Sequence, residues 1–380
     1  MKIFKVCISL FFIFVLTGNA YSKISAPKII KAGILLDVTD AIIACDKVYN
    51  IKNKETQLTL SAGKVAVQLN GKKVLIKNKV YSLPLKVTSS SFIIVNKKIY
   101  RGSIIIRLSS KGKLNIINEV DIEDYLKGIL PKEASSDWPI EALKSQAVIS
   151  RSYVLKNLAK HSKDGFDVCS TVHCQVYGGA SAETKKCNEA VVKTFGEVVV
   201  YDKKIAQTLF HSSCGGHTED PKYVWGWTTK TPPYLKGIKD KYCKKNPNQN
   251  WTCTLKESVI REKLIKAGYK TGKIKSIKFQ GKTPGLAKEN VIIKHSKGTL
   301  KLNSYKFRTT VDPWKIKSTM ISSSKKSGDS FIFKGNGWGH KVGLCQWGSK
   351  FMADKGYSYK KILKYYYPST SIEKVNYAKQ

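Results

Sequence analysis

Glu133 is the candidate catalytic acid of this sequence, with a carboxyl group that could act on a polymeric substrate. It lies in the segment DIEDYLKGILPKEASSDWPIEALKSQAVISRSYVL (121–155), just ahead of an amphipathic helical pattern. A single carboxyl group can donate a proton as a general acid and then take one back as a general base. A solvated loop glutamate is about as common, so the residue type alone leaves both interpretations open.

The elements on either side of Glu133 follow from local signals. The proline two residues before it indicates an irregular segment over residues 132–137, which places Glu133 in a loop. Asp137 is the expected N-cap of a helix over residues 139–161, with a proline in its first turn. A helix N-terminus near Glu133 would favour the ionised carboxylate, whereas packing against Trp138 would raise its pKa, so its charge state stays open.

Arginine is scarce in this chain, and Arg151 falls on the same predicted helix, 18 residues after Glu133. We expect Arg151 to reach toward a substrate cleft, where it would lower the pKa of Glu133 or hold a substrate carboxylate with two parallel hydrogen bonds. A surface arginine is the alternative.

Two glycine-rich segments, HSSCGGHTED (211–220) and residues 335–368, interrupt the predicted elements. Glycine permits tight turns and close approach of a ligand, and aromatic faces beside hydrogen-bonding groups suit sugar rings. A polar hairpin end is about as good an explanation of the first segment. The residues expected to bind substrate are His211, Ser213, Gly215, Gly216, Thr218, Trp338, His340 and Gln346.

A group of thiols and imidazoles, His161, Cys169, His173 and Cys174, lies within HSKDGFDVCSTVHCQVYGG (161–179). Two thiolates and two imidazoles are suitable ligands for tetrahedral zinc, although the spacing is not that of a common zinc ribbon. A disulfide between the two cysteines is the competing interpretation. The sequence requires no cofactor, and a structural zinc ion is the one that it suggests.

Residues 1–22 have the pattern of a signal peptide, with lysines before an apolar run that is too short to span a bilayer. We therefore expect an exported protein, in the periplasm, outside the cell or at the cell wall, with no transmembrane anchor after cleavage. Cysteines pair in such compartments. Cys214 and Cys345 lie in the two glycine-rich segments, and we predict a disulfide between them.

The formal net charge is +40, from 67 basic and 27 acidic residues spread over the whole chain. Nearly all of the basic residues are lysine. The planar guanidinium that recognises bases and phosphates is therefore scarce, and nucleic acid is not an expected partner. A polyanionic surface such as the cell wall fits better, with a merely solvated lysine-rich surface as the alternative.

The predicted fold class is α+β, with a strand-rich N-terminal part followed by a mixed α/β catalytic core that forms a substrate cleft. Short strands separated by Ala62-Gly63, Asn70-Gly71 and Lys111-Gly112 turns characterise residues 23–117. The core covers residues 118–375, and we expect it to form one continuous unit with the N-terminal part. Besides the helix after Glu133, helices are predicted at 183–193, 255–267, 349–355 and 359–366, with a strand pair at 197–209.

Taken together, these segments resemble the SpoIID/LytB family, the stage II sporulation protein D and amidase-enhancer proteins of bacterial cell-wall remodelling. The resemblance covers roughly residues 29–372. It rests on YRG, EDYLKGILPKE, DWPIEALKSQAVISRSYVL, DVCSTVHCQVYGG, HSSCGGHTED, PPYLKGIKDKYC, FRTTVD and GWGHKVGLCQWGSKFMADKGYSYKKILKYYYP, in that order. The chain departs from the usual family pattern at Ala134, Ser150 and Lys341.

The resemblance implies lytic cleavage of peptidoglycan between N-acetylmuramic acid and N-acetylglucosamine, particularly on strands stripped of stem peptides. It implies that Glu133 is the catalytic acid and that Arg151 is the arginine on the helix after it. Some family members bind zinc near the positions matched by Cys169, His173 and Cys174. A lytic transglycosylase needs one carboxyl group, because the muramoyl C6 hydroxyl supplies the nucleophile.

Three other functions stay open at this stage. A hydrolase needs a second carboxylate, which Asp137, Glu123 or Asp124 could supply. A non-catalytic wall-binding protein that enhances an N-acetylmuramyl-L-alanine amidase is suggested by the amidase-enhancer branch of the family. A catalytic zinc centre at the histidine and cysteine group is the least favoured, because catalytic zinc sites keep an open position and few thiolates.

Overall fold

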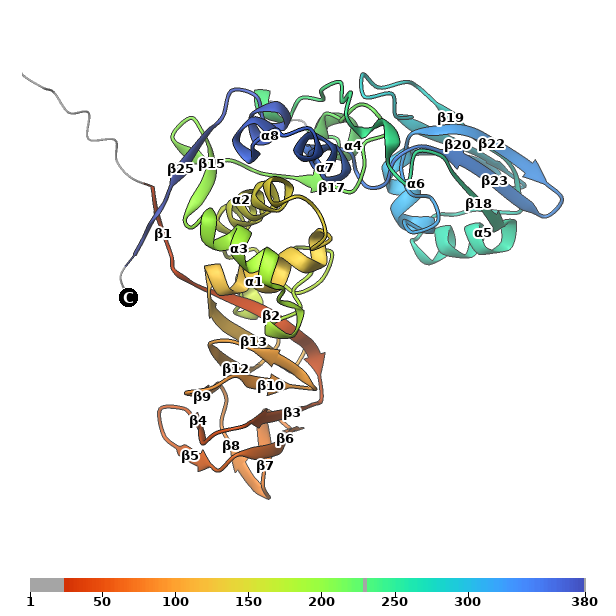
Figure 1. Cartoon of the computed structure of the whole chain (residues 1–380). Helices are drawn as coiled ribbons and strands as arrows, with labels where there is room; N and C mark the ends of the chain where they lie inside the picture. The colour runs from red at the N-terminus through yellow and green to blue at the C-terminus, as the bar shows by residue number, and fades with distance from the viewer. Residues whose placement is uncertain (1–23, 228–230, 379–380) are drawn as a thin grey trace, which may run out of the picture.

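The computed structural model describes residues 24–227 and 231–378. The predicted signal peptide lies outside these ranges. Within them, no helix combines the length and apolar character that crossing a membrane requires. The architecture is α+β, as predicted, with the strands of the first hundred residues below a helical body in Figure 1 and a third, strand-rich part beside that body.

Two sheets form the N-terminal part. The first has seven strands in the order β14-β2-β13-β12-β9-β4-β5. Its strands are β2 (Ile29–Val38), β4 (Tyr49–Lys52), β5 (Gln57–Leu60), β9 (Leu85–Ser89), β12 (Ser103–Leu108), β13 (Leu114–Asp121) and β14 (Val168–Cys169). The second has six strands in the order β11-β10-β3-β6-β7-β8. They are β3 (Asp40–Cys45), β6 (Gly63–Asn70), β7 (Lys73–Ile76), β8 (Lys79–Tyr81), β10 (Ile93–Val95) and β11 (Lys98–Tyr100).

The turn signals of this part have different outcomes. Asn70-Gly71 joins β6 to β7 and Lys111-Gly112 lies between β12 and β13, both as antiparallel pairs, as predicted. Ala62-Gly63 does not close a hairpin, because β5 and β6 belong to different sheets. Gly63 has a φ of +138°, a backbone conformation that glycine adopts readily. The chain crosses from one sheet to the other at this point.

The helical body begins where β13 ends. The side chain of Asp121 accepts a hydrogen bond from the backbone N–H of Glu123 and so caps α1 (Ile122–Glu133). The other helices of this body are α2 (Ile140–Lys156), α3 (Lys185–Lys193), α4 (Pro221–Trp225), α7 (Gln346–Asp354) and α8 (Tyr359–Tyr366). Short sheets complete it: β15 (Glu197–Tyr201), β16 (Lys204–Ile205) and β25 (Ser371–Lys374) form one, β17 (Phe210–His211) pairs with β24 (Leu344–Cys345), and β1 (Ser25–Ala26) with β26 (Asn376–Tyr377).

Helix α2 is the centre of this body. Buried residues lie on all of its faces, since α1, α3, α7, α8 and β15 pack around it. The sequence pattern predicted one apolar face and polar residues elsewhere, yet Gln146, Ser150 and Arg151 are buried too. The predicted N-cap is also wrong: the helix begins after Pro139, which makes no side-chain cap, and not after Asp137.

Residues 251–335 form the third part, which has a hydrophobic core of its own around Phe307, Phe331 and Phe333. One sheet contains β18 (Trp251–Lys256), β22 (Ile321–Ser327) and β23 (Ser330–Gly335), and another contains β19 (Ile274–Gln280), β20 (Asn290–His295) and β21 (Gly298–Asn303). The helices α5 (Glu257–Lys266) and α6 (Ser304–Val311) cover them. After β23 the chain returns to the helical body.

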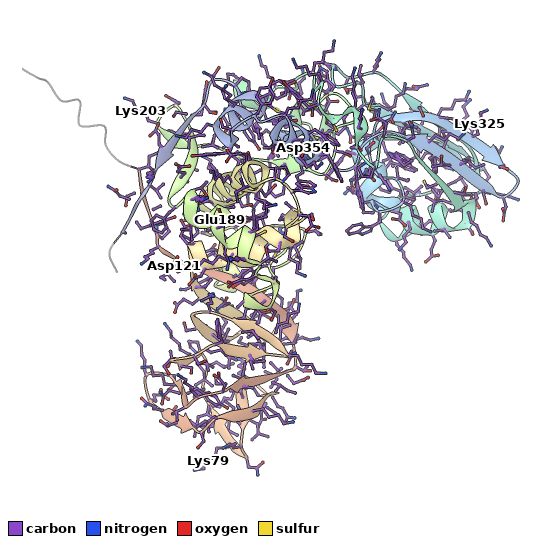
Figure 2. The ribbon with its side chains drawn as sticks, in the orientation of Figure 1. Lys79, Asp121, Glu189, Lys203, Lys325 and Asp354 are labelled. Atoms are coloured by element: carbon purple, nitrogen blue, oxygen red, sulfur yellow. The ribbon has the colours of Figure 1, made fainter. Side chains whose placement is uncertain are left out.

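Exposed lysines occur in all three parts of the molecule, and Figure 2 labels one in each. Lys79 lies at the far end of the N-terminal strands, Lys203 at the edge of the helical body and Lys325 on the distal strands of the third part, and all three are exposed. The positive charge therefore surrounds the molecule and is not gathered on one arm.

Candidate active site

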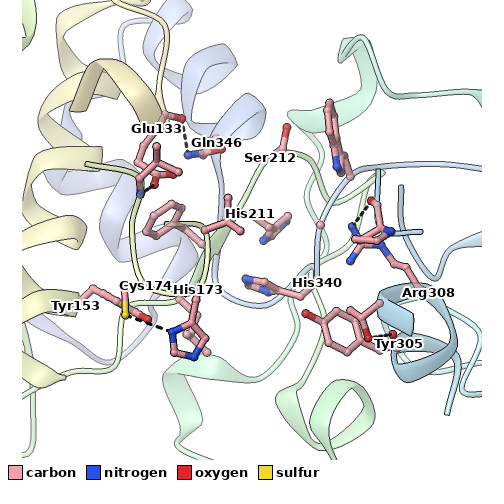
Figure 3. A pocket seen from close by; sticks show the side chains of 18 of the residues that line it. Glu133, Tyr153, His173, Cys174, His211, Ser212, Tyr305, Arg308, His340 and Gln346 are labelled. Atoms are coloured by element: carbon pink, nitrogen blue, oxygen red, sulfur yellow. Dashed lines mark hydrogen bonds between the residues drawn. The ribbon is translucent and has the colours of Figure 1, made fainter. Parts of the chain in front are cut away.

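A cleft of about 660 Å³ lies between the helical body and the third part. Figure 3 shows Glu133 and Gln346 on one wall, Tyr305 and Arg308 on the opposite wall, and His211 and His340 between them. The lining residues are Glu133, Tyr153, Lys160, Val172, His173, Cys174, Val176, Leu209, Phe210, His211, Ser212, Trp225, Tyr305, Arg308, Thr309, Pro313, Trp314, Trp338, Gly339, His340 and Gln346.

Glu133 is the last residue of α1, so the prediction that it lies in a loop is wrong. The helix continues past Pro131 because the residues before it, Leu126 and Leu130, are anchored in the core. The carboxylate Oε1 of Glu133 accepts a hydrogen bond of 2.8 Å from the backbone N–H of Val176. Its backbone carbonyl accepts one of 2.9 Å from the side-chain amide of Gln346. One hydrogen bond thus holds the side chain of Glu133 and another holds its backbone.

The pKa of Glu133 is raised above its ordinary value. Burial disfavours the charged form, and this outweighs the opposing effect of the Val176 N–H, which favours the carboxylate. The Glu133 side chain therefore keeps its proton to a higher pH than an exposed glutamate does, which suits a general acid.

Among the described residues that line the cleft, Glu133 is the only one with a carboxyl group. Of the candidates for a second carboxylate, Asp137 is exposed and outside the cleft, and Asp124 pairs with Lys127 at 2.7 Å. Glu123 is buried in a different place. The cleft therefore offers one acid and no partner carboxylate.

Arg151 does not reach the cleft, which corrects its predicted position. Its guanidinium is fully buried and makes two hydrogen bonds with the carboxylate of Glu123, at 2.8 and 2.6 Å, and a third of 2.9 Å to the backbone carbonyl of Glu197. Glu123 also accepts hydrogen bonds from the N–H of Gly196 and the hydroxyl of Tyr377. Arg151 thus joins α2 to α1, β15 and the C-terminal strand. It stabilises the packing of α1, the helix that ends in Glu133.

Two imidazoles lie beside each other at the base of the cleft, His211 and His340, with ring centroids 5.6 Å apart. Burial lowers the pKa of His340 to about 4, with a further contribution from Arg308, and burial also lowers that of His211. Both rings are therefore neutral at pH 7. Nδ1 of His211 lies 3.1 Å from the carbonyl of Val342, whereas its Nε2 has no hydrogen-bond partner among the described residues.

The other residues predicted to bind substrate divide into two groups. Trp338 and Gln346 line the cleft, like the two histidines. Ser213, Gly215, Gly216 and Thr218 do not line it, which corrects their expected position, and their part in substrate binding stays a prediction. They shape the loops behind it: Ser213 pairs with Trp338 through two backbone hydrogen bonds, and the hydroxyl of Thr218 accepts a hydrogen bond from the N–H of Ile238.

The opposite wall of the cleft contains residues that the sequence analysis did not select. Arg308 is buried, donates hydrogen bonds to the carbonyls of Ile316 and Pro313 at 2.8 and 3.0 Å, and places a cation at the cleft. Trp314 is 64% exposed and packs edge-on against Trp338. Arg308 stands in the FRTTVD motif and is one of the few arginines, and this scarcity is the signal that could have selected it.

The thiols and imidazoles of His161, Cys169, His173 and Cys174 do come together, with all their candidate ligand atoms within 4.8 Å of one another. Nε2 of His161 lies 3.4 Å from Sγ of Cys174, and Nδ1 of His173 lies 3.6 Å from Sγ of each cysteine. Two sulfurs and two nitrogens at these separations fit a tetrahedral zinc ion with no open position. His173 and Cys174 also line the cleft, so this group supports its rim.

Cys214 and Cys345 are also neighbours, but the predicted disulfide is not formed, and every described cysteine is a free thiol. Cys243 and Asp240 complete a second group with them, again with candidate ligand atoms within 4.8 Å. We call Cys214, Asp240, Cys243 and Cys345 the thiol cluster.

Comparison with known proteins finds a family match over the segment that contains Glu133. The sequence model of the family described as Stage II sporulation protein matches residues 110–201, which include Glu133 and α2. An uncharacterised protein of Brachyspira hyodysenteriae is 32% identical over 87% of this chain and 88% of its own length. The amidase enhancer of Bacillus subtilis is 29% identical over 93% of this chain and 54% of its own length.

The stage II sporulation protein D of Bacillus subtilis is 31% identical over 283 residues, which cover 68% of this chain and 76% of that protein. The similarity to these relatives therefore extends well beyond residues 110–201. The chain belongs to the SpoIID/LytB family.

Proposed function

We propose that this protein acts at the bacterial cell wall as a peptidoglycan lytic transglycosylase, which cleaves the bond between N-acetylmuramic acid and N-acetylglucosamine. The observation that carries the proposal is the single carboxyl group of the cleft, Glu133. A glycosidase that activates water or forms a covalent intermediate uses two carboxylates on either side of the bond. A site with one acid suits a reaction in which the substrate supplies the nucleophile.

The two halves of this reaction require two protonation states of Glu133. The protonated form, favoured by its raised pKa, gives its proton to the glycosidic oxygen as the bond to C1 breaks. The resulting carboxylate takes the proton of the muramoyl C6 hydroxyl, whose oxygen attacks C1 and closes a 1,6-anhydro ring. The proton returns to Glu133, and the N–H of Val176 stabilises the transient carboxylate.

The opposite wall has the side chains to hold the sugar chain. Trp338 and Trp314 offer aromatic faces, and sugar rings pack on such faces with their hydroxyls free to hydrogen-bond. Arg308 faces Glu133 across the cleft and suits the lactyl carboxylate that a muramic acid exposes when its stem peptide has been removed. We therefore propose peptide-stripped glycan as the substrate.

The test compares Glu133→Gln with Asp137→Asn, an amidation of an exposed carboxylate a few residues away. The mature protein is incubated with denuded glycan, and the products are identified by mass spectrometry. We expect wild type and Asp137→Asn to produce 1,6-anhydro ends, and Glu133→Gln to lose about 10² to 10⁴ in rate. Hydrated reducing ends, or a fully active Glu133→Gln protein, would show that the proposed reaction is wrong.

A second candidate function is the enhancement of an N-acetylmuramyl-L-alanine amidase by wall binding without catalysis. The similarity over 93% of this chain to a protein named amidase enhancer favours it. The same variant separates the two functions, because Glu133→Gln retains the fold and the charged surface. If amidase activity on cell walls rises equally with wild type and with Glu133→Gln, enhancement does not depend on cleavage.

The group of His161, Cys169, His173 and Cys174 would hold a structural zinc ion in the proposed protein. Bound there, zinc would supply cross-linking of the loop that carries Val176, and we assign it no role in the reaction. We also propose that the protein is exported to the periplasm or the cell wall, where its substrate is found. Fractionation of cells that produce the full chain, with and without residues 1–22, tests this location.

A further inference from the structure

The thiol cluster brings together three parts of the chain that are far apart in sequence. Cys214 follows β17, Cys243 begins a short 3-10 turn at Cys243–Lys245, and Cys345 is the N-cap of α7. All four members of the cluster are buried. Sγ of Cys345 lies 3.3 Å from Sγ of Cys243, and Sγ of Cys214 lies 3.2 Å from a carboxylate oxygen of Asp240.

We propose that Cys214, Cys243, Cys345 and Asp240 form a second zinc site, which is structural and separate from the histidine and cysteine group at the cleft rim. Three sulfurs and one carboxylate oxygen supply the four ligands of a closed tetrahedral site. Zinc bound at about 2.3 Å from each sulfur would hold the sulfurs roughly 3.8 Å apart. The group, with all its ligand atoms within 4.8 Å, needs only small adjustments to reach that geometry.

The surroundings of the cluster supply hydrogen-bond donors to all three sulfurs. Each sulfur accepts N–H hydrogen bonds: Cys214 from Gly216 at 3.3 Å, Cys345 from Cys214 and Gly348 at 3.3 Å each, and Cys243 from the side-chain amide of Asn246 at 3.4 Å. Such donors stabilise negative charge on the sulfurs that bind a metal. The start of α7 adds the positive end of its dipole at Cys345.

Asp240 is oriented in the same way. One of its carboxylate oxygens accepts hydrogen bonds from the N–H groups of Tyr242 and Cys243, at 2.9 and 3.2 Å. The other oxygen, which faces Cys214, accepts one of 2.8 Å from the hydroxyl of Tyr366. A ligand carboxylate that is held by further hydrogen bonds is typical of built metal sites.

A disulfide accounts for this group less well than zinc does. Three thiols cannot all pair, so a bridge between any two would leave the third buried beside it. Zinc uses all three sulfurs, and binding releases their protons to solvent without any oxidant. Soft thiolates with one carboxylate favour zinc over magnesium or calcium, which prefer oxygen ligands only.

This site would fix the walls of the cleft. His211 and Ser212 precede Cys214 by a few residues, and Gln346 directly follows Cys345; all three line the cleft. Gln346 in turn donates its hydrogen bond to the backbone carbonyl of Glu133. A metal that ties Cys214 to Cys345 therefore holds the residues on both sides of the general acid.

The test measures zinc by mass spectrometry in the mature protein, purified without chelator or added oxidant. We compare wild type with Cys243→Ser, which removes one ligand, and with Cys253→Ser, a cysteine outside both groups. We expect Cys243→Ser to lose about one zinc ion per chain relative to wild type, and Cys253→Ser to lose none. Zinc bound by His161, Cys169, His173 and Cys174 is present in all three proteins, so it does not affect the difference in zinc content between them. Equal zinc content in all three proteins would overturn the proposal.

A second measurement covers the case in which Cys243→Ser does not fold. In wild-type protein loaded with Co²⁺, the thiolate-to-cobalt absorption band should have the intensity of five cobalt–sulfur bonds per chain. Two of these bonds come from Cys169 and Cys174, and three come from the thiol cluster. Peptide mapping of unreduced wild type should find Cys214, Cys243 and Cys345 unlinked after metal removal. A band with the intensity of two cobalt–sulfur bonds per chain or fewer would reject the site. A disulfide joining any two of these residues would also reject it.

Discussion

Glu133 owes its proposed chemistry to desolvation and not to a charged neighbour. No cation pairs with its carboxylate among the described residues, and the only hydrogen bond that its side chain accepts comes from the backbone of Val176. Burial is therefore the main influence on its pKa, and burial raises it. From the sequence, a nearby helix N-terminus could lower the pKa of Glu133 and packing could raise it. In the structure the effect of packing is the larger one.

This shift has a consequence for stability. The folded protein holds the Glu133 proton to a higher pH than the unfolded chain does, so wild-type stability falls as the pH rises through that window. Glutamine does not titrate. We expect the free energy of unfolding of Glu133→Gln, relative to wild type, to increase between pH 4 and pH 7 in urea titrations. A difference that is constant over this range would contradict the raised pKa.

Arg151 shows how a residue near an active site in sequence can serve the fold alone. Its ion pair with Glu123 is buried on both sides, and removing one partner of such a pair costs about 3–5 kcal/mol. We expect Arg151→Ala to lose that much stability in chemical denaturation. The matched control is Arg261→Ala, whose side chain is 39% exposed and pairs with Glu257 one helical turn away, with a cost of about 1 kcal/mol or less.

Activity separates the structural role of Arg151 from a catalytic one. Arg151→Lys preserves the charge and part of the pairing, so its remaining folded molecules should cleave glycan at the wild-type rate. An Arg151→Lys protein that is as stable as wild type but inactive would show that Arg151 takes part in catalysis.

At the scale of elements, the sequence predicted regular patterns well and interrupted ones poorly. The helices at α2, α5, α7 and α8 lie within a few residues of their predictions, because their apolar spacing and terminal signals agree. Helix α1 was not predicted, and Pro131 in its last turn was interpreted as the start of an irregular segment. Core packing of the preceding residues outweighs that local preference.

The site was only partly predictable for a similar reason. Glu133, His211, His340, Trp338 and Gln346 stand in recognisable motifs and do meet in the cleft. The wall that faces them comes from α6 and the residues after it, which are more than 150 positions from Glu133 in the chain. No local pattern reports such a juxtaposition, so Arg308 and Trp314 were not selected.

The loop between β23 and β24 depends on glycine. Gly339 has a φ of +113°, and a Cβ there would lie 2.8 Å from Cβ of His211. We expect Gly339→Ala to strain the backbone by about 1–2 kcal/mol and also to displace His211, with a large loss of turnover. Gly356→Ala is the control: its φ is +79°, no atom lies near its Cβ, and it should lose stability without losing activity. Calorimetry and glycan cleavage, measured on both variants, check this; equal turnover in the two would contradict it.

At the scale of the whole molecule, the cleft lies where two separately packed parts meet. The third part has its own core around Phe307, while the helical body has others around α2. A cleft between two cores can change its width without disrupting either one. The lysines that surround both parts provide a long-range attraction to anionic polymers that does not depend on the shape of the cleft.

This separation of charge from chemistry predicts two different responses to salt. Binding to intact cell walls should weaken steeply as ionic strength rises, because the Debye length falls from about 10 Å at 0.1 M to about 3 Å at 1 M and screens the exposed lysines. Cleavage of short peptide-stripped glycan fragments should fall much less steeply over the same range, since they carry few charges and meet one buried cation, Arg308, beside aromatic contacts and a partly buried acid. Sedimentation with purified walls and turnover of the fragments, measured in parallel from low to high salt, compare the two. If turnover falls as steeply as binding, charge dominates recognition inside the cleft as it does on the surface, and Arg308→Gln should then remove most of the salt dependence of turnover.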